Sequence, residues 1–87
     1  MKMNINMKKI VFFLLVQFVA IGAFAQEAAI KEAEVAYTKE DYGKAIELYE
    51  GLLKTHGESA EIYYNLGNAY YKENKIAPAI LNYERAL

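Results

Sequence analysis

The fold is decided by the stretch Tyr63–Leu87, YYNLGNAYYKENKIAPAILNYERAL, in which small residues stand between large ones. Tyrosine and asparagine together are typical of a binding surface, but the same residue types also pack helices against one another. Ile80, Tyr83 and Leu87 lie at positions i, i+3 and i+7, so they share one face of a helix. The stretch therefore predicts helical packing, and the role of its tyrosines has to be decided residue by residue.

The pattern occurs twice along the chain, because a shift of 34 residues superposes like residues. The matching pairs are Ala33 and Gly67, Tyr37 and Tyr71, Ala45 and Ala79, Ile46 and Ile80, Tyr49 and Tyr83, Glu50 and Glu84, and Leu53 and Leu87. A fixed period of this length indicates a repeated supersecondary unit. Each copy divides into two helix-length stretches with a period of about 3.6 residues, at 27–39 and 42–54 and then at 60–73 and 77–87.

Local signals mark the ends of these expected helices. Ser59 is expected to cap the helix that starts at residue 60, and Asn74 is expected to end that helix in a left-handed conformation. Pro78 is tolerated in the first turn of the last helix, where its missing N–H is not needed. The sequence THGES at 55–59 reads as the turn between the two copies.

The second copy resembles the tetratricopeptide repeat, through Tyr63-x2-Leu66-Gly67-x2-Tyr70 followed by Ala79-x3-Tyr83. The resemblance implies an all-α fold of two antiparallel helix-turn-helix hairpins that form a short right-handed solenoid. A first, degenerate repeat would span 26–59, and a second repeat, incomplete at its C-terminal end, would span 60–87. The packing positions of the family match Tyr63, Leu66, Gly67, Tyr70, Ala79, Tyr83 and Ala86, with Ala45 and Tyr49 as their counterparts in the first copy.

The same resemblance implies a concave groove lined by the first helix of each repeat, which binds other proteins. In the second copy that face comprises Glu61, Tyr64, Asn65, Asn68, Tyr71 and Lys72, and in the first copy Glu27, Ile30, Lys31, Glu34, Tyr37 and Thr38. Asn65 and Asn68 either bond the backbone of a bound peptide or serve the repeat itself, and both alternatives stay open. The clamp that some members use for a C-terminal carboxylate is rejected, because Ile30 and Glu34 stand where it needs lysine and asparagine.

The first 25 residues form a separate segment with the features of a secretory signal peptide. Lys2, Lys8 and Lys9 precede an apolar run, and small residues at Ala23 and Ala25 suit a signal peptidase that cleaves before Gln26. The alternative is an uncleaved anchor that holds the repeats at a membrane, although the apolar run is shorter than the roughly 20 residues of a typical span. We expect an exported protein of the bacterial periplasm or cell envelope.

Composition excludes several classes of function. The chain has no cysteine, so it has neither a disulfide nor a thiolate nucleophile. Three of its ten Lys and Arg residues lie within the first 25 positions, where no acid occurs, so the remainder carries a net negative charge and nucleic acid is an unexpected partner. The one histidine, His56, lies in a turn without a partner for metal binding or catalysis. We therefore expect no catalysis, no metal and no cofactor.

A narrower resemblance is to the N-terminus of exported tetratricopeptide proteins of the Bacteroides aerotolerance type, specifically their E-component, with NKIAP at 74–78 similar to their inter-helix turn. Leu87 ends the last helix where a repeat would continue, and solenoids need about three repeats. A piece of a longer protein is therefore expected, with self-association through the open helix or a marginal fold as alternatives. The expected function is a non-catalytic scaffold that binds a peptide or helix in the groove.

Overall fold

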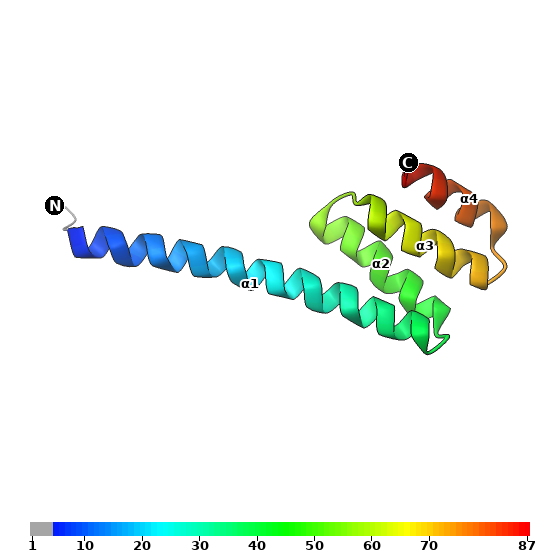
Figure 1. Ribbon diagram of the computed structural model, residues 1–87, viewed down its shortest axis with the longest axis horizontal. Coiled ribbons are helices and arrows are strands. Elements are labelled where there is room, and N and C mark those ends of the chain that lie inside the picture. The colour runs from blue at the N-terminus through cyan, green and yellow to red at the C-terminus, as the bar shows by residue number, and fades with distance from the viewer. Residues whose placement is uncertain (1–4) are drawn as a thin grey trace.

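The computed structural model describes residues 5–87, with side chains described for 7–9 and 24–87. This part of the chain forms four helices and no strand: α1 (Ile5–Thr38), α2 (Tyr42–His56), α3 (Ala60–Lys72) and α4 (Ile76–Arg85) (Figure 1). Each helix packs against the next one along the chain, and successive helices run in opposite directions. The prediction of an all-α fold built from helical hairpins is confirmed.

The first helix differs from its predicted start at residue 27, because α1 is continuous from Ile5 to Thr38. Residues 25–36 contain neither proline nor glycine and are rich in alanine and glutamate, so nothing in them ends a helix. The proposed cleavage after Ala25 therefore falls inside a helix. Figure 1 shows the N-terminal half of α1 extending beyond the hairpins, while its C-terminal half packs on α2.

Of the predicted signal segment, residues 1–4 lie outside the described residues and the backbone of 5–25 is part of α1, and the role of the segment stays a prediction. Among the residues that the structure describes, no helix combines the length and the apolar character needed to cross a membrane.

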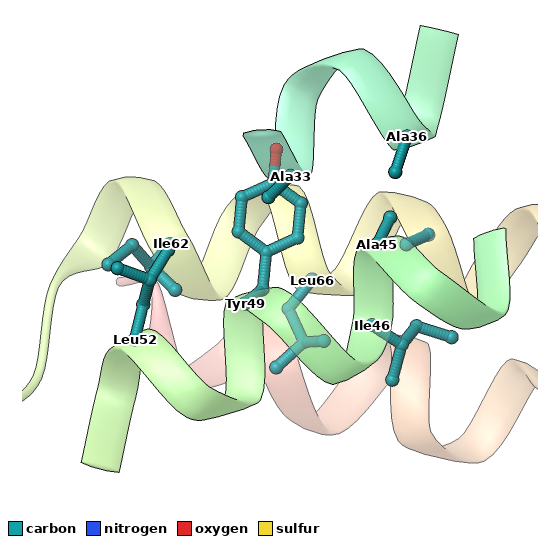
Figure 2. Packing of buried hydrophobic residues seen from close by; sticks show 9 residues of the cluster. Ala33, Ala36, Ala45, Ile46, Tyr49, Leu52, Ile62 and Leu66 are labelled. Carbon is teal, nitrogen blue, oxygen red and sulfur yellow. The ribbon is translucent and has the colours of Figure 1, made fainter. Parts of the chain in front are cut away.

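The hydrophobic core lies where α1, α2 and α3 meet (Figure 2). Alanines at the contact of α1 with α2 let the two helices approach closely, and larger side chains fill the space next to them. The buried cluster comprises Ala33, Ala36, Ala45, Ile46, Tyr49, Leu52, Ile62, Leu66 and Ala69. The two hairpins are therefore joined by the packing of α3 on α2, and each hairpin is held together by the contact between its own two helices.

The turns inside the two hairpins have the same backbone geometry. Glu40 and Asn74 both have positive φ, of 63° and 61°, and they are related by the 34-residue shift. In both turns an N–H one residue further on bonds a carbonyl five residues back, from Asp41 to Ala36 and from Lys75 to Tyr70. These bonds define a Schellman ending of α1 and of α3. The left-handed conformation predicted for Asn74 is confirmed, and that of Glu40 is a finding of the structure.

The helix starts follow the sequence signals. The Ser59 hydroxyl accepts a hydrogen bond from the Ile62 N–H at 3.3 Å, so the predicted cap of α3 is confirmed. Asp41 caps α2 in the same way by accepting from the Lys44 N–H. Pro78 lies in the first turn of α4, as predicted, and the predicted helix ends differ from the observed ones by one or two residues.

Candidate functional site

A cavity of about 280 Å³ lies between α1 and α3, with α2 behind it. Its walls bring together residues from both predicted groove faces, although these residues are far apart in the sequence. It is lined by Glu34, Tyr37 and Thr38 of α1, Tyr49 of α2, and Asn65 and Asn68 of α3. The first helices of the two hairpins therefore form one shared groove.

Tyr49 is the most buried of the residues that line this cavity. Its side chain is 2% exposed, and its ring is directed from α2 toward Ala33 on α1 (Figure 2). Burial, together with the carboxylates of Glu34 and Glu61, raises the pKa of Tyr49 to about 12. The Tyr49 hydroxyl makes no hydrogen bond to any other described residue. It is therefore a neutral polar group that faces the cavity without a partner.

The equivalent tyrosine of the second hairpin is partnered. The Tyr83 hydroxyl donates to the Asn68 side-chain oxygen at 2.5 Å, which ties α4 to α3. The ring of Tyr83 lies 5.9 Å from that of Tyr64, between centroids, and burial raises the pKa of Tyr83. Asn68 therefore supports the hairpin internally, whereas Asn65 makes no side-chain hydrogen bond within the described part of the chain.

Other predicted groove residues lie outside the cavity itself. Tyr64 and Tyr71 are exposed, as are Lys31 and Lys72, and none of the four lines the cavity. Tyr37 is half-buried, and its ring meets that of Tyr42 edge-on at 5.3 Å. The structure thus brings together one part of the predicted groove set and leaves the other part at the surface around it.

The predicted packing residues fall into two groups. Leu66, Gly67, Ala79, Ala45 and Tyr49 are buried, whereas Tyr63, Tyr70, Tyr83 and Ala86 are only half-buried. Three of these four tyrosines are therefore only partly buried at their packing positions. Their rings pack against neighbouring helices, but each hydroxyl reaches a polar partner. Tyr63 donates to Glu58, Tyr70 to Glu50 and Tyr83 to Asn68.

Gly67 explains the close contact of α3 with α4. A Cβ atom at this position would lie 2.7 Å from the Cδ1 and Cε1 atoms of the Tyr83 ring. The glycine therefore makes room for the ring, which is the packing role expected for it.

The sequence pattern does not mark Tyr49 as a groove residue, because its repeat position is a packing position. The available signal was its hydroxyl: both copies carry tyrosine where the family usually has phenylalanine, and a buried hydroxyl normally needs a partner.

A second cavity, of about 320 Å³, lies on the opposite side between α2 and α4. Its walls are mainly apolar, and they include Leu53, Tyr70, Leu81 and Asn82. Asn82 is buried, and its Nδ2 donates to the Pro78 carbonyl at 2.8 Å while its Oδ1 has no partner among the described residues. This side of the molecule is separate from the groove between α1 and α3.

Comparison with protein families matches the second hairpin. Residues 60–87 form a tetratricopeptide repeat. Such repeats generally mediate protein–protein interactions and are typically non-catalytic scaffolds. A comparison with curated proteins gave no match. The first hairpin lies outside the matched residues, and its relation to the second hairpin rests on the 34-residue shift and on the equivalent turns at Glu40 and Asn74.

The described residues contain no group of three or more His, Cys, Asp or Glu side chains able to hold a metal ion. His56 is the last residue of α2 and is exposed. The expectation that the protein has no catalytic activity stays a prediction.

Proposed function

We propose that this protein is a non-catalytic scaffold of the bacterial envelope that binds a peptide or helix of another protein between α1 and α3. The observation that carries the proposal is the shared cavity, because it combines Asn65 and Thr38 with the unpartnered Tyr49 hydroxyl. Exposed Tyr64 and Tyr71 extend this polar cavity with aromatic surface, which is common where proteins recognise partners. Residues 60–87 contribute a repeat of a kind that generally mediates such contacts.

The proposed place in the envelope rests on residues 1–25. Their lysines, apolar run and Ala23-Phe24-Ala25 sequence support export, as does the narrower resemblance to exported aerotolerance-type proteins. Sequencing the N-terminus of the protein recovered from bacterial envelopes tests this. A first residue at Gln26 supports export with cleavage, while an intact N-terminus in a membrane fraction supports the anchored alternative.

Asn65→Ala tests the groove. We expect peptides selected from a random library against the full chain to lose about tenfold or more in affinity, because the amide is free to bond a peptide backbone. The fold should be retained, because alanine is the better helix former. Glu47→Ala is the control, since Glu47 is exposed on α2 and lines neither cavity. Equal affinities for N65A, E47A and the unmodified chain argue against the groove.

We also propose self-association through α4 as a second role. Ile80 of α4 is 52% exposed, whereas its repeat equivalent Ile46 is 9% exposed because α3 covers it. Ile76 and Leu87, at four residues before and seven after Ile80, extend this exposed apolar face. Exposed apolar patches mark contact surfaces, and a second copy would present the same one. Sedimentation at increasing concentration should show a dimer that Ile80→Lys abolishes, and a monomer at every concentration rules this role out.

A further inference from the structure

The first hairpin contains an unpaired counterpart of a bond that the second hairpin makes. Shifting by 34 residues places Glu34 on Asn68 and Tyr49 on Tyr83. Asn68 and Tyr83 are joined by a hydrogen bond, whereas Glu34 and Tyr49 are not, although both line the same cavity. One hairpin thus satisfies its tyrosine internally, and the other leaves the Glu34 carboxylate of α1 and the Tyr49 hydroxyl of α2 in the same cavity with no bond between them.

Both of these groups call for a partner from outside the chain. Tyr49 is 2% exposed as a residue, but its hydroxyl is not among the fully buried polar atoms, and it makes no hydrogen bond within the described residues, so it is open to a partner in the cavity. Glu34 makes no ion pair with any described residue, the one recorded pair being that between Lys75 and Glu73. The cavity of about 280 Å³ greatly exceeds the roughly 10–15 Å³ that a single water molecule needs. There is room for a side-chain head group.

Every polar group around this space can accept a hydrogen bond, and the one charged group among them is the carboxylate of Glu34. Glu34 offers a carboxylate, Asn65 an amide oxygen and Tyr49 a hydroxyl that accepts as well as donates. No lysine or arginine lines the cavity within the described residues, since Lys31 and Lys72 lie at the surface outside it. Tyr37 adds an aromatic ring, and such rings attract cations. Acceptors, one uncompensated negative charge and an aromatic ring together match a cation with several N–H donors.

We infer that this cavity receives an arginine or lysine side chain of the bound segment, with Glu34 as its counter-charge and the Tyr49 hydroxyl and Asn65 amide as further acceptors. The inference rests on the proposed function, because it names the chemistry of the partner for the same groove. An acidic partner side chain would be repelled by Glu34, and an apolar one would leave Glu34 and Tyr49 buried without partners. The carboxylate-recognising clamp of other tetratricopeptide proteins is thus replaced by the opposite charge preference.

The test is a peptide selection with the full chain, followed by a charge-coupling measurement. Peptides selected from a random library should carry a shared arginine or lysine. Replacing that residue with the uncharged citrulline or norleucine should weaken binding to the unmodified protein about tenfold, the size expected for a close charge pair. In the Glu34→Gln variant of the protein, the same replacement in the peptide should change the affinity less than about twofold, because the protein no longer supplies the counter-charge.

Two further variants sharpen the measurement. Glu32→Gln changes the same charge on the same helix, but Glu32 is exposed and does not line the cavity, so the basic peptide should bind it like the unmodified protein. Tyr49→Phe removes the unpartnered hydroxyl without removing a hydrogen bond of the fold, and it should weaken the basic peptide several-fold.

The outcomes separate the two proposals. The basic-side-chain inference is wrong, and the groove remains, if the selected peptides depend on Asn65 but lack a basic residue. The same conclusion follows if replacing the basic residue weakens binding equally to the unmodified protein and to E34Q. If no selected peptide depends on Asn65, both the inference and the proposed function are wrong.

Discussion

At the scale of single residues, the helical glycines Gly51 and Gly67 differ in what surrounds them. Gly67 lies so close to the Tyr83 ring that a methyl group at this position would not fit. At Gly51, nothing lies within 4 Å of the place that a Cβ atom would take. Glycine inside a helix is less favourable than alanine by roughly 1 kcal/mol. The same glycine-to-alanine change is therefore expected to have opposite effects at the two positions.

Gly67→Ala should lower the free energy of unfolding by about 1–3 kcal/mol, the usual cost of overpacking, while Gly51→Ala should raise it by about 0.5–1 kcal/mol. Thermal unfolding of both variants checks this. Two stabilised variants would show that the contact between α3 and α4 is looser than the Tyr83 geometry implies.

Two tyrosines with raised pKa values make the stability of the protein depend on pH in the alkaline range. The pKa values of Tyr49 and Tyr70 are raised from 10.0 to about 12, mainly by burial. Because the folded protein holds these protons more tightly than the unfolded chain, the stabilisation is complete below pH 10 and is lost as the pH rises toward 12. Each unit of pKa difference corresponds to about 1.4 kcal/mol.

Chemical denaturation at pH 9, 10.5 and 12 should therefore show decreasing stability, with a smaller decrease for Tyr49→Phe. At pH 7 the same variant should be about as stable as the unmodified chain, because its hydroxyl makes no hydrogen bond within the fold. Tyr70→Phe is the comparison, since it loses the bond to Glu50 and should cost about 1 kcal/mol at pH 7. An identical pH dependence in Y49F and the unmodified chain would contradict the role of Tyr49.

At the scale of helices and turns, both hairpins use the same left-handed residue position. Asparagine adopts this conformation more readily than glutamate does, so Asn74 fits its turn better than Glu40 fits the equivalent turn. Glu40→Gly should stabilise the protein by about 0.5–1 kcal/mol, and Asn74→Gly should have a smaller effect. Urea unfolding of the two variants measures the difference, and a destabilised E40G would mean that the Glu40 side chain contributes contacts that the turn geometry does not reveal.

The sequence predicted the helices because their signals are local. Ser59, Pro78 and Asn74 act on residues within one turn of themselves, and the structure agrees with each of them. The start of α1 was predicted wrongly, because the repeat pattern begins near residue 27 while the helix-forming residues continue upstream without a break. The repeat pattern gives the first residue of the repeated unit. It does not give the first residue of the helix, which depends on where the backbone is capped.

The groove was predictable only in part, because its composition depends on contacts between helices. Asn65 and Asn68 look alike in the sequence, but only Asn68 is close enough to Tyr83 to be used within the fold. Tyr49 and Tyr83 likewise occupy the same repeat position and differ only in the residue opposite, glutamate in one case and asparagine in the other. Helical periodicity gives the face of each residue, and it does not give its partner on the next helix.

At the scale of the whole molecule, the two hairpins make a groove that neither has alone. Glu34, Tyr37 and Thr38 come from the first hairpin, and Asn65 and Asn68 come from the second. The contact of α3 with α2 places these two sets opposite each other, with Tyr49 between them. Any change that separates the hairpins should therefore remove binding along with stability.

Nuclear magnetic resonance of the isotope-labelled full chain, titrated with a library-selected peptide, tests the central claim most directly. If the protein binds partners between α1 and α3, the signals of Thr38, the Tyr49 ring and the Asn65 side-chain amide should shift first and most strongly. Shifts confined to the second cavity, at Leu53 and Leu81, would place binding on the opposite side of the molecule and contradict the account.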